Sequence, residues 1–300
     1  MAAPTQTPPS AGPGRLRLGD RLVGRGELIV MAIVNRTPDS FYDRGATYAE
    51  DAAMERVREV VAQGADMVDI GGVKAGYGAY VSPEEEIART AGFVGRVRGE
   101  FPELPISVDT WRHEVGRAVC AEGATVLNDA WGGTDPQLAE VAAEFRAGLV
   151  CTHAGGLGPR TDPHRVGYDD VMADILRVTV GLATRAVSLG VEPSRVMIDP
   201  GHDFAKTTWH SLEATRRLPE MVQTGWPVLV SLSNKDFVGE TLDASLDDRM
   251  YGTLAASAIS AWLGATVYRA HNVPQTRATL DMVASIRGDR LPARTMRGLA

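Results

Sequence analysis

The sequence predicts an α/β protein with a single domain, folded as a (β/α)8 TIM barrel. Eight short apolar runs recur along the 300 residues, and amphipathic segments separate them. Most of the runs do not alternate with polar residues, which is typical of parallel strands covered on both faces. Eight strand–helix units in a chain of this length favour a closed barrel. The alternative is an open doubly wound sheet, but no Gly-x-Gly-x-x-Gly turn follows the first run.

Each apolar run is expected to form one strand of the barrel. In chain order the expected strands are Leu28–Val34, Met67–Ile70, Pro105–Val108, Thr125–Leu127, Gly148–Cys151, Arg195–Ile198, Pro227–Leu232 and Thr266–Tyr268.

The segments between these runs carry helix signals. Apolar residues recur at helical spacing after the first strand. Ser82 is expected to cap the next helix, with Pro83 in its first turn and Glu85 completing a capping box. Four helices are expected to end at a glycine just before a strand, because glycine readily adopts the left-handed conformation that stops a helix. These glycines are Gly64, Gly123, Gly190 and Gly264.

Composition limits the class of protein and its partners. The net charge of −7 argues against a nucleic-acid partner. No apolar run approaches the roughly 18 residues of a membrane span, and two cysteines are too few for a disulfide framework, which fits a cytoplasmic protein. We expect a disordered tail over residues 1–15, with no features of a signal peptide, a domain over 16–286 and a loose C-terminal tail over 287–300.

Every expected strand ends on a polar or charged side chain. These residues are Asn35, Asp69, Asp109, Asn128 and Asp129, His153, Asp199, Ser233 and Lys235, and Arg269 and His271. Any one of them could simply mark the point where a strand becomes a loop. In a TIM barrel, however, the carboxyl ends of all strands meet at one mouth, where active sites form. The complete series therefore predicts a site.

The residue types at these ends indicate a ligand with two chemical parts. The carboxylates of Asp109 and Asp199, together with the amide of Asn128, suit a heterocycle with adjacent N–H donors. Lys235, Arg269 and His271, with Asn35, are expected to lie opposite and to bind an oxyanion or phosphate. Arg269 and His271 are two residues apart, so on a strand both side chains point to one side. The chain lacks zinc-ligand spacing, a nucleophile elbow and a P-loop motif.

The same segments resemble dihydropteroate synthase. Asn35-Arg36-Thr37-Pro38-Asp39-Ser40-Phe41 is similar to the family's first loop, Asn-Val-Thr-Pro-Asp-Ser-Phe. The further similar motifs, in the family's order, are Asp69-Ile70-Gly71-Gly72, Ser107-Val108-Asp109-Thr110, Asn128-Asp129, Asp199-Pro200-Gly201, Ser233-Asn234-Lys235 and Arg269-Ala270-His271-Asn272-Val273. The resemblance extends from about Ile29 to Val273.

This resemblance implies a folate-biosynthesis transferase that joins 6-hydroxymethyl-7,8-dihydropterin pyrophosphate to p-aminobenzoate. It implies that Asp109, Asn128, Asp199 and Lys235 bind the pterin. It implies that Asn35, Arg269 and His271 bind the pyrophosphate, Asn35 with Mg2+, and that Ser233 binds p-aminobenzoate or a sulfonamide-like ligand. Lys235, Arg269 and His271 are the implied catalytic residues. It also implies a homodimer.

The chain departs from the family pattern mainly in the loops. Where the family has Glu-Ser-Thr-Arg-Pro in its second loop, the chain has Val73-Lys74-Ala75-Gly76-Tyr77, and Asn234 replaces an arginine. His202-Asp203-Phe204-Ala205-Lys206 replaces the usual Gly-Phe-Gly-Lys run. We therefore expect synthase activity to be weak or lost. The alternatives are a fully active enzyme, in which Arg36, Arg44 or Lys74 restores charge, and a non-catalytic pterin-binding module.

Overall fold

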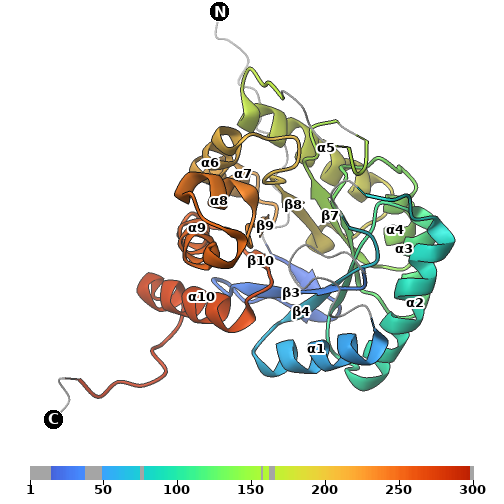
Figure 1. Ribbon diagram of the computed structural model, residues 1–300, viewed down its shortest axis with the longest axis horizontal. Helices are drawn as coiled ribbons and strands as arrows, with labels where there is room; N and C mark the ends of the chain where they lie inside the picture. The colour runs from blue at the N-terminus through green and yellow to red at the C-terminus, as the bar shows by residue number, and fades with distance from the viewer. Residues whose placement is uncertain (1–14, 38–48, 75–77, 157, 162–165, 298–300) are drawn as a thin grey trace, which may run out of the picture.

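The structure is a nearly closed barrel of eight parallel strands surrounded by helices (Figure 1). This computed structural model describes residues 15–37, 49–74, 78–156, 158–161 and 166–297. The strands are β3 (Ile29–Asn35), β4 (Met67–Gly71), β5 (Ile106–Asp109), β6 (Val126–Asp129), β7 (Gly148–Thr152), β8 (Val196–Asp199), β9 (Leu229–Ser231) and β10 (Val267–Ala270). Their order around the barrel is β8-β7-β6-β5-β4-β3-β10-β9, and a parallel bridge between Ile198 and Val228 joins the two ends. The predicted TIM barrel with one domain is confirmed.

Helices alternate with the strands and cover the outside of the barrel (Figure 1). They are α1 (Glu50–Ala62), α2 (Pro83–Glu100), α3 (His113–Ala121), α4 (Leu138–Glu144), α5 (Val171–Ser188), α6 (Thr208–Arg216), α7 (Leu218–Val222), α8 (Asp236–Leu242), α9 (Met250–Trp262) and α10 (Val273–Arg287). Among the described residues, no helix is both long enough and apolar enough to cross a membrane.

The predicted helix signals are largely confirmed. All four glycines expected to end helices have a positive φ, between +93° and +106°. The Ser82 hydroxyl accepts a hydrogen bond from the Glu85 amide at 3.2 Å, as an N-cap does. The Glu85 carboxylate does not complete a capping box; it accepts from Arg89 one turn later instead, because the guanidinium is a stronger donor than a backbone amide.

A small hairpin closes the amino-terminal end of the barrel, and the sequence analysis did not anticipate it. Strands β1 (Arg17–Leu18) and β2 (Arg21–Leu22) pair antiparallel. Leu16, Leu18 and Val23 pack on the interior side chains of the strands and are at most 3% exposed. This contact seals the apolar interior at the end opposite the mouth.

The interior changes from apolar to polar along each strand. Successive side chains of a strand face opposite sides, so every second residue shares one face. Met67, Val126, Met197 and Val267 belong to the interior apolar cluster, and the residues two positions later are Asp69, Asn128, Asp199 and Arg269. The polar residues therefore form the layer next to the mouth.

Candidate ligand site at the mouth of the barrel

The predicted site residues lie at the carboxyl ends of neighbouring strands. Asn35, Asp109 and Asp199 are the last residues of β3, β5 and β8. Asp109 pairs in register with Asn128 of β6. Ser233 and Lys235 follow β9, and His271 follows β10. The barrel therefore brings residues more than 200 positions apart to one mouth.

The guanidinium of Arg269 bridges two carboxylates. Its Nε lies 2.5 Å from Asp69 Oδ2, and a terminal nitrogen lies 3.0 Å from Asp109 Oδ2. Arg269 is predicted to stand opposite the carboxylates, and its strand β10 lies three places from β5 in the ring; its guanidinium nevertheless bonds directly to both Asp69 and Asp109. In the closed ring β10 lies beside β3, so the long side chain reaches β4 and β5 across the interior.

Asp69 is a site residue to which the sequence analysis assigned no role. It is fully buried, and its carboxylate accepts hydrogen bonds from Ser107 Oγ at 2.6 Å and from Asn128 Nδ2 at 3.2 Å. The bonds from Ser107 and Arg269 hold the Asp69 carboxylate in place. Asp69 in turn fixes the orientation of the Asn128 amide. The available signal was a charged residue between two apolar ones, on the inward face of a predicted strand.

Burial shifts the protonation of the two carboxylates that the resemblance assigns to the ligand. Burial raises the pKa of Asp109 to about 7, although Arg269 opposes the shift. Burial also raises the pKa of Asp199, which Lys235 and a 2.7 Å bond from the Gly201 amide oppose. Both carboxylates thus lie in a low-dielectric layer where an N–H donor from a ligand is stabilising.

Lys235 and His271 complete the mouth on the β9–β10 side. The Lys235 ammonium donates to the His202 carbonyl and lies 4.7 Å from the centre of the Phe204 ring. Ser233 Oγ contacts His271 twice, at 3.2 Å from its amide and 3.0 Å from Nδ1. Burial, together with Arg269, lowers the pKa of His271 to about 3, so its imidazole is neutral near pH 7.

Comparison with known proteins places this barrel in a family. Residues 31–271 match the family model described as pterin binding enzyme. The chain belongs to the dihydropteroate synthase family. A Mycobacterium leprae protein named inactive dihydropteroate synthase 2 is 54% identical over 284 residues, which are 93% of this chain and 98% of that protein.

Proteins named as dihydropteroate synthase without that qualifier are more distant. The Bacillus subtilis dihydropteroate synthase is 36% identical over 257 residues, covering 85% of this chain and 87% of that protein. The crystal structure of the Yersinia pestis dihydropteroate synthase with a sulfonamide drug superimposes with a TM-score of 0.86 at 30% identity, covering 92% of this chain and all of that one.

Arg36, which differs from the family's usual residue, packs against α2 in the part of the chain that the structure describes. It is 7% exposed. Its Nε donates to the Arg89 carbonyl at 3.2 Å, and its guanidinium lies 5.0 Å from the centre of the Phe93 ring, both on α2. The described contacts of its side chain are thus with α2, and the hypothesis that Arg36 restores a cation at the site stays a prediction. Arg44 and residues 75–77 lie outside the described residues.

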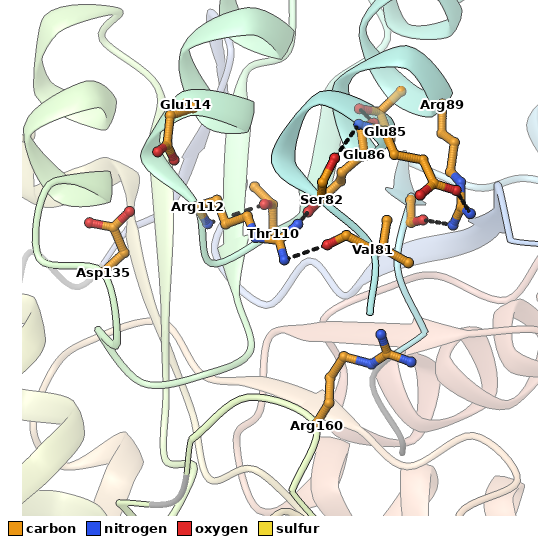
Figure 2. Close-up of polar contacts among 12 residues, drawn as sticks. Val81, Ser82, Glu85, Glu86, Arg89, Thr110, Arg112, Glu114, Asp135 and Arg160 are labelled. Atoms are coloured by element: carbon orange, nitrogen blue, oxygen red, sulfur yellow. Dashed lines mark hydrogen bonds and ion pairs between the residues drawn. The ribbon is translucent and has the colours of Figure 1, made fainter. Parts of the chain in front are cut away.

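The carboxyl-terminal part of the second loop is held by two arginines that the sequence analysis missed (Figure 2). Arg112, at the N-cap of α3, donates at 2.7 Å to both the Glu86 carboxylate and the Val81 carbonyl. Arg160, from the loop after β7, donates to the Ala79 carbonyl. Glu86 is fully buried, and burial raises its pKa. These contacts attach the loop to α2, α3 and the β7 loop.

An aromatic group beside the polar layer was also missed. Trp131 makes edge-to-face contacts with Trp111, at a centroid distance of 6.3 Å, and with Phe204, at 5.1 Å. The three rings come from the loops after β5, β6 and β8, so only the closed barrel brings them together. They provide an apolar surface next to Asp109, Asn128 and Asp199 on which a flat heterocycle can pack.

Asp129 is a structural residue of this site. Its carboxylate accepts hydrogen bonds from the backbone amides of Trp131, at 3.0 Å, and Gly133, at 2.7 Å. Asp129 thereby shapes the turn that carries Trp131. Burial raises its pKa to about 7.

Proposed function

We propose that this protein binds a reduced pterin at the mouth of the barrel and has weak or no dihydropteroate synthase activity. One observation carries the proposal. The residues assigned to the pterin are all present, whereas two arginines of the family pattern are lost, one in the second loop and one at Asn234. The inactive status named for the Mycobacterium leprae relative supports the same conclusion.

The pterin has a natural position in this layer. Its adjacent N–H donors pair with the carboxylates of Asp199 and Asp109, and Asn128 and Lys235 contact the remaining edge. The rings of Trp131 and Phe204, which contact each other, are proposed to pack on the pterin ring. Charge-assisted hydrogen bonds of this kind are about twice as strong as neutral ones, so this half of the site favours tight binding.

Synthase chemistry needs more than this layer. The C–O bond at the pterin methylene breaks, the diphosphate leaves with the electron pair, and the amine nitrogen of p-aminobenzoate bonds to that carbon and loses a proton. The protein assists by positioning both substrates and by stabilising the leaving anion. Each preorganised donor removed from such a clamp costs on the order of a hundredfold in rate.

Two cations of that clamp are absent, and a third is already engaged. Asn234 stands where the family has arginine; it is buried with a φ of +56°, and its backbone is held by Thr253 Oγ1 and Arg249. Arg269 is present, but its guanidinium already forms ion pairs with Asp69 and Asp109. The second loop has no arginine in its family position. A fully active enzyme would therefore need a further cation to replace these arginines.

We also propose that Mg2+ accompanies the diphosphate. Asn35, the last residue of β3, offers one neutral amide oxygen, which suits a cation that keeps waters and phosphate oxygens as its other ligands. Among the described residues, the one group of three side chains able to share a metal is His113 and Glu114 of α3 with Asp135 of the loop before α4. Asn35 thus fits a metal that arrives with the substrate. Bound there, Mg2+ would neutralise charge on the leaving anion.

A second copy of the chain is the proposed partner. Tyr251, Ile259 and Trp262 of α9 and Met282 and Ile286 of α10 are each at least 55% exposed, on two helices that pack against each other. Exposed apolar patches of this kind mark interaction surfaces. We propose a homodimer through this α9–α10 face. A cytoplasmic location is likewise proposed, and it fits the two buried free cysteines.

A paired measurement tests the proposal. Titration calorimetry with a 7,8-dihydropterin should show binding, while a pyrophosphate-release assay with both substrates and Mg2+ should show little or no turnover. Turnover at ordinary enzyme rates, about 1 s−1 or more, would establish the fully active alternative. Binding with no release at all would establish the non-catalytic module. Absence of pterin binding would refute the proposal.

A further inference from the structure

The turn after β8 contains a carboxylate where the family pattern has glycine. Asp203 adopts the left-handed conformation, with φ of +65°, and Ala205 does the same with φ of +46°. Glycine is the residue that usually takes this conformation, although Asp reaches it more easily than most others. An L-residue at these two positions must therefore be compensated by contacts that hold the turn.

The side chain of Asp203 makes those contacts away from the mouth. Ser211 Oγ, on α6, lies 3.1 Å from Asp203 Oδ1 and also accepts the Asp203 amide at 3.1 Å. The Phe237 amide, in the first turn of α8, donates to Asp203 Oδ2 at 3.3 Å. Ser211 is fully buried. Asp203 therefore ties the turn to two helices.

The two neighbours of Asp203 in the chain hold the ammonium of Lys235. The His202 carbonyl accepts its hydrogen bond, and the Phe204 ring lies 4.7 Å from it. Lys235 is also the N-cap residue of α8, the helix whose first turn donates to Asp203. Asp203 thus holds Lys235 at two points. Its hydrogen bond with α8 fixes the Lys235 backbone, and the 202–204 turn fixes the Lys235 ammonium.

We propose that Asp203 is a positioning residue for Lys235, which it holds at the mouth by fixing the 202–204 turn against α6 and α8. The charged groups around the ammonium are Asp199, Asp203, Asp236, Arg269 and Lys206. Asp199 remains beside Lys235 when Asp203 is replaced, so the side chain keeps a carboxylate partner. The effect on ligands rests on the proposed function, since Lys235 then contacts the pterin.

Three substitutions separate positioning from backbone strain and from charge. Asp203→Gly relieves the strained backbone but removes the anchor, and we expect dihydropterin affinity to fall about tenfold, since a misplaced contact group costs this much or more. Ala205→Gly relieves strain in the same turn without touching the anchor, so its affinity should stay within about twofold of wild type. Asp203→Asn keeps an acceptor and suits the left-handed conformation, so it should retain affinity within about threefold.

A second measurement does not depend on pterin. Acylation of Lys235 by a small activated ester, located by mass spectrometry, should become at least about threefold faster in Asp203→Gly, because a looser supporting shell exposes the amine. It should not change in Ala205→Gly. Ser211→Ala, which removes both hydrogen bonds between Ser211 and Asp203, is the substitute if Asp203→Gly does not fold, and it should also raise the acylation rate.

The outcomes separate this proposal from the proposed function. If wild type binds no dihydropterin, the proposed function fails, and the acylation rates alone decide the role of Asp203. If Asp203→Gly matches wild type in both measurements, Asp203 does not position Lys235. If Asp203→Asn loses as much affinity as Asp203→Gly, the charge and not the turn matters, and the proposal is wrong.

Discussion

Asp69 and Arg269 are 200 residues apart in the sequence, and their side chains meet at 2.5 Å inside the barrel. This ion pair joins β4 to β10 across β3. Asp69 is fully buried, so the pair depends on its hydrogen bonds to remain favourable in a low-dielectric layer. It organises the polar layer around which the site is built.

Asp69→Asn should lower the free energy of unfolding by about 3–5 kcal/mol, because it removes one of the two carboxylates that neutralise a buried guanidinium. Urea denaturation measures the change. Asp51→Asn is the control, since Asp51 forms an exposed ion pair with Arg96 and should cost less than about 1 kcal/mol. Equal effects of the two substitutions would mean that the buried pair has no special role.

Asp199→Asn should weaken pterin binding by about 2–4 kcal/mol, because ligand N–H groups lose a charged acceptor. Titration calorimetry gives the affinity, and a thermal melt checks that the variant is folded. Unchanged affinity would remove Asp199 from the pterin site.

Replacement of residues 73–77 by Glu-Ser-Thr-Arg-Pro should raise synthase turnover at least about tenfold, equivalent to about 1.4 kcal/mol in the barrier. Asn234→Arg should add to the gain, and the two changes are expected to couple because they act on the same anion. Gly76→Arg alone should rescue poorly, since an isolated cation is not positioned. Pyrophosphate release is the assay. A folded, pterin-binding graft without any gain would place the cause outside the second loop.

Asp129 should make stability depend on pH. Burial raises its folded pKa to about 7, above the ordinary value of 3.8. Between these values the folded protein binds a proton that the unfolded chain has released, so this contribution to stability falls as pH rises from about 4 to about 7 and then levels off. In Asp129→Asn the free energy of unfolding should depend less on pH between about 4 and 7, by the contribution of about one proton. Urea denaturation at several pH values tests this, and an unchanged slope would show that Asp129 is ionised throughout.

Trp262→Glu should dissociate the proposed dimer, because it places a charge on the exposed apolar α9–α10 face. Light scattering after gel filtration gives the mass. Leu22→Glu, on the hairpin that closes the amino-terminal end of the barrel, is the matched control and should leave the mass unchanged. A wild-type protein that is monomeric at all concentrations would overturn the proposed interface.

Much of the barrel could be predicted because the sequence patterns that mark its helices and strands are local. Helix-stopping glycines, the Ser82 cap and short apolar runs each depend on residues within one turn or one strand. The hairpin that closes the barrel was missed, since two-residue strands carry almost no periodic signal and are stabilised by the interior side chains on which they pack.

The sequence by itself determined which polar groups end the strands, because alternation along a strand directs every second side chain inward. Only the tertiary structure decided how those groups pair. Ring closure places β10 beside β3, so Arg269 reaches Asp69 and Asp109. The guanidinium of Arg36 packs on the Phe93 ring of α2, and the meeting of three loops forms the aromatic group around Trp131. Charge pairing depends on distances between distant segments, and those distances exist only once the barrel has closed.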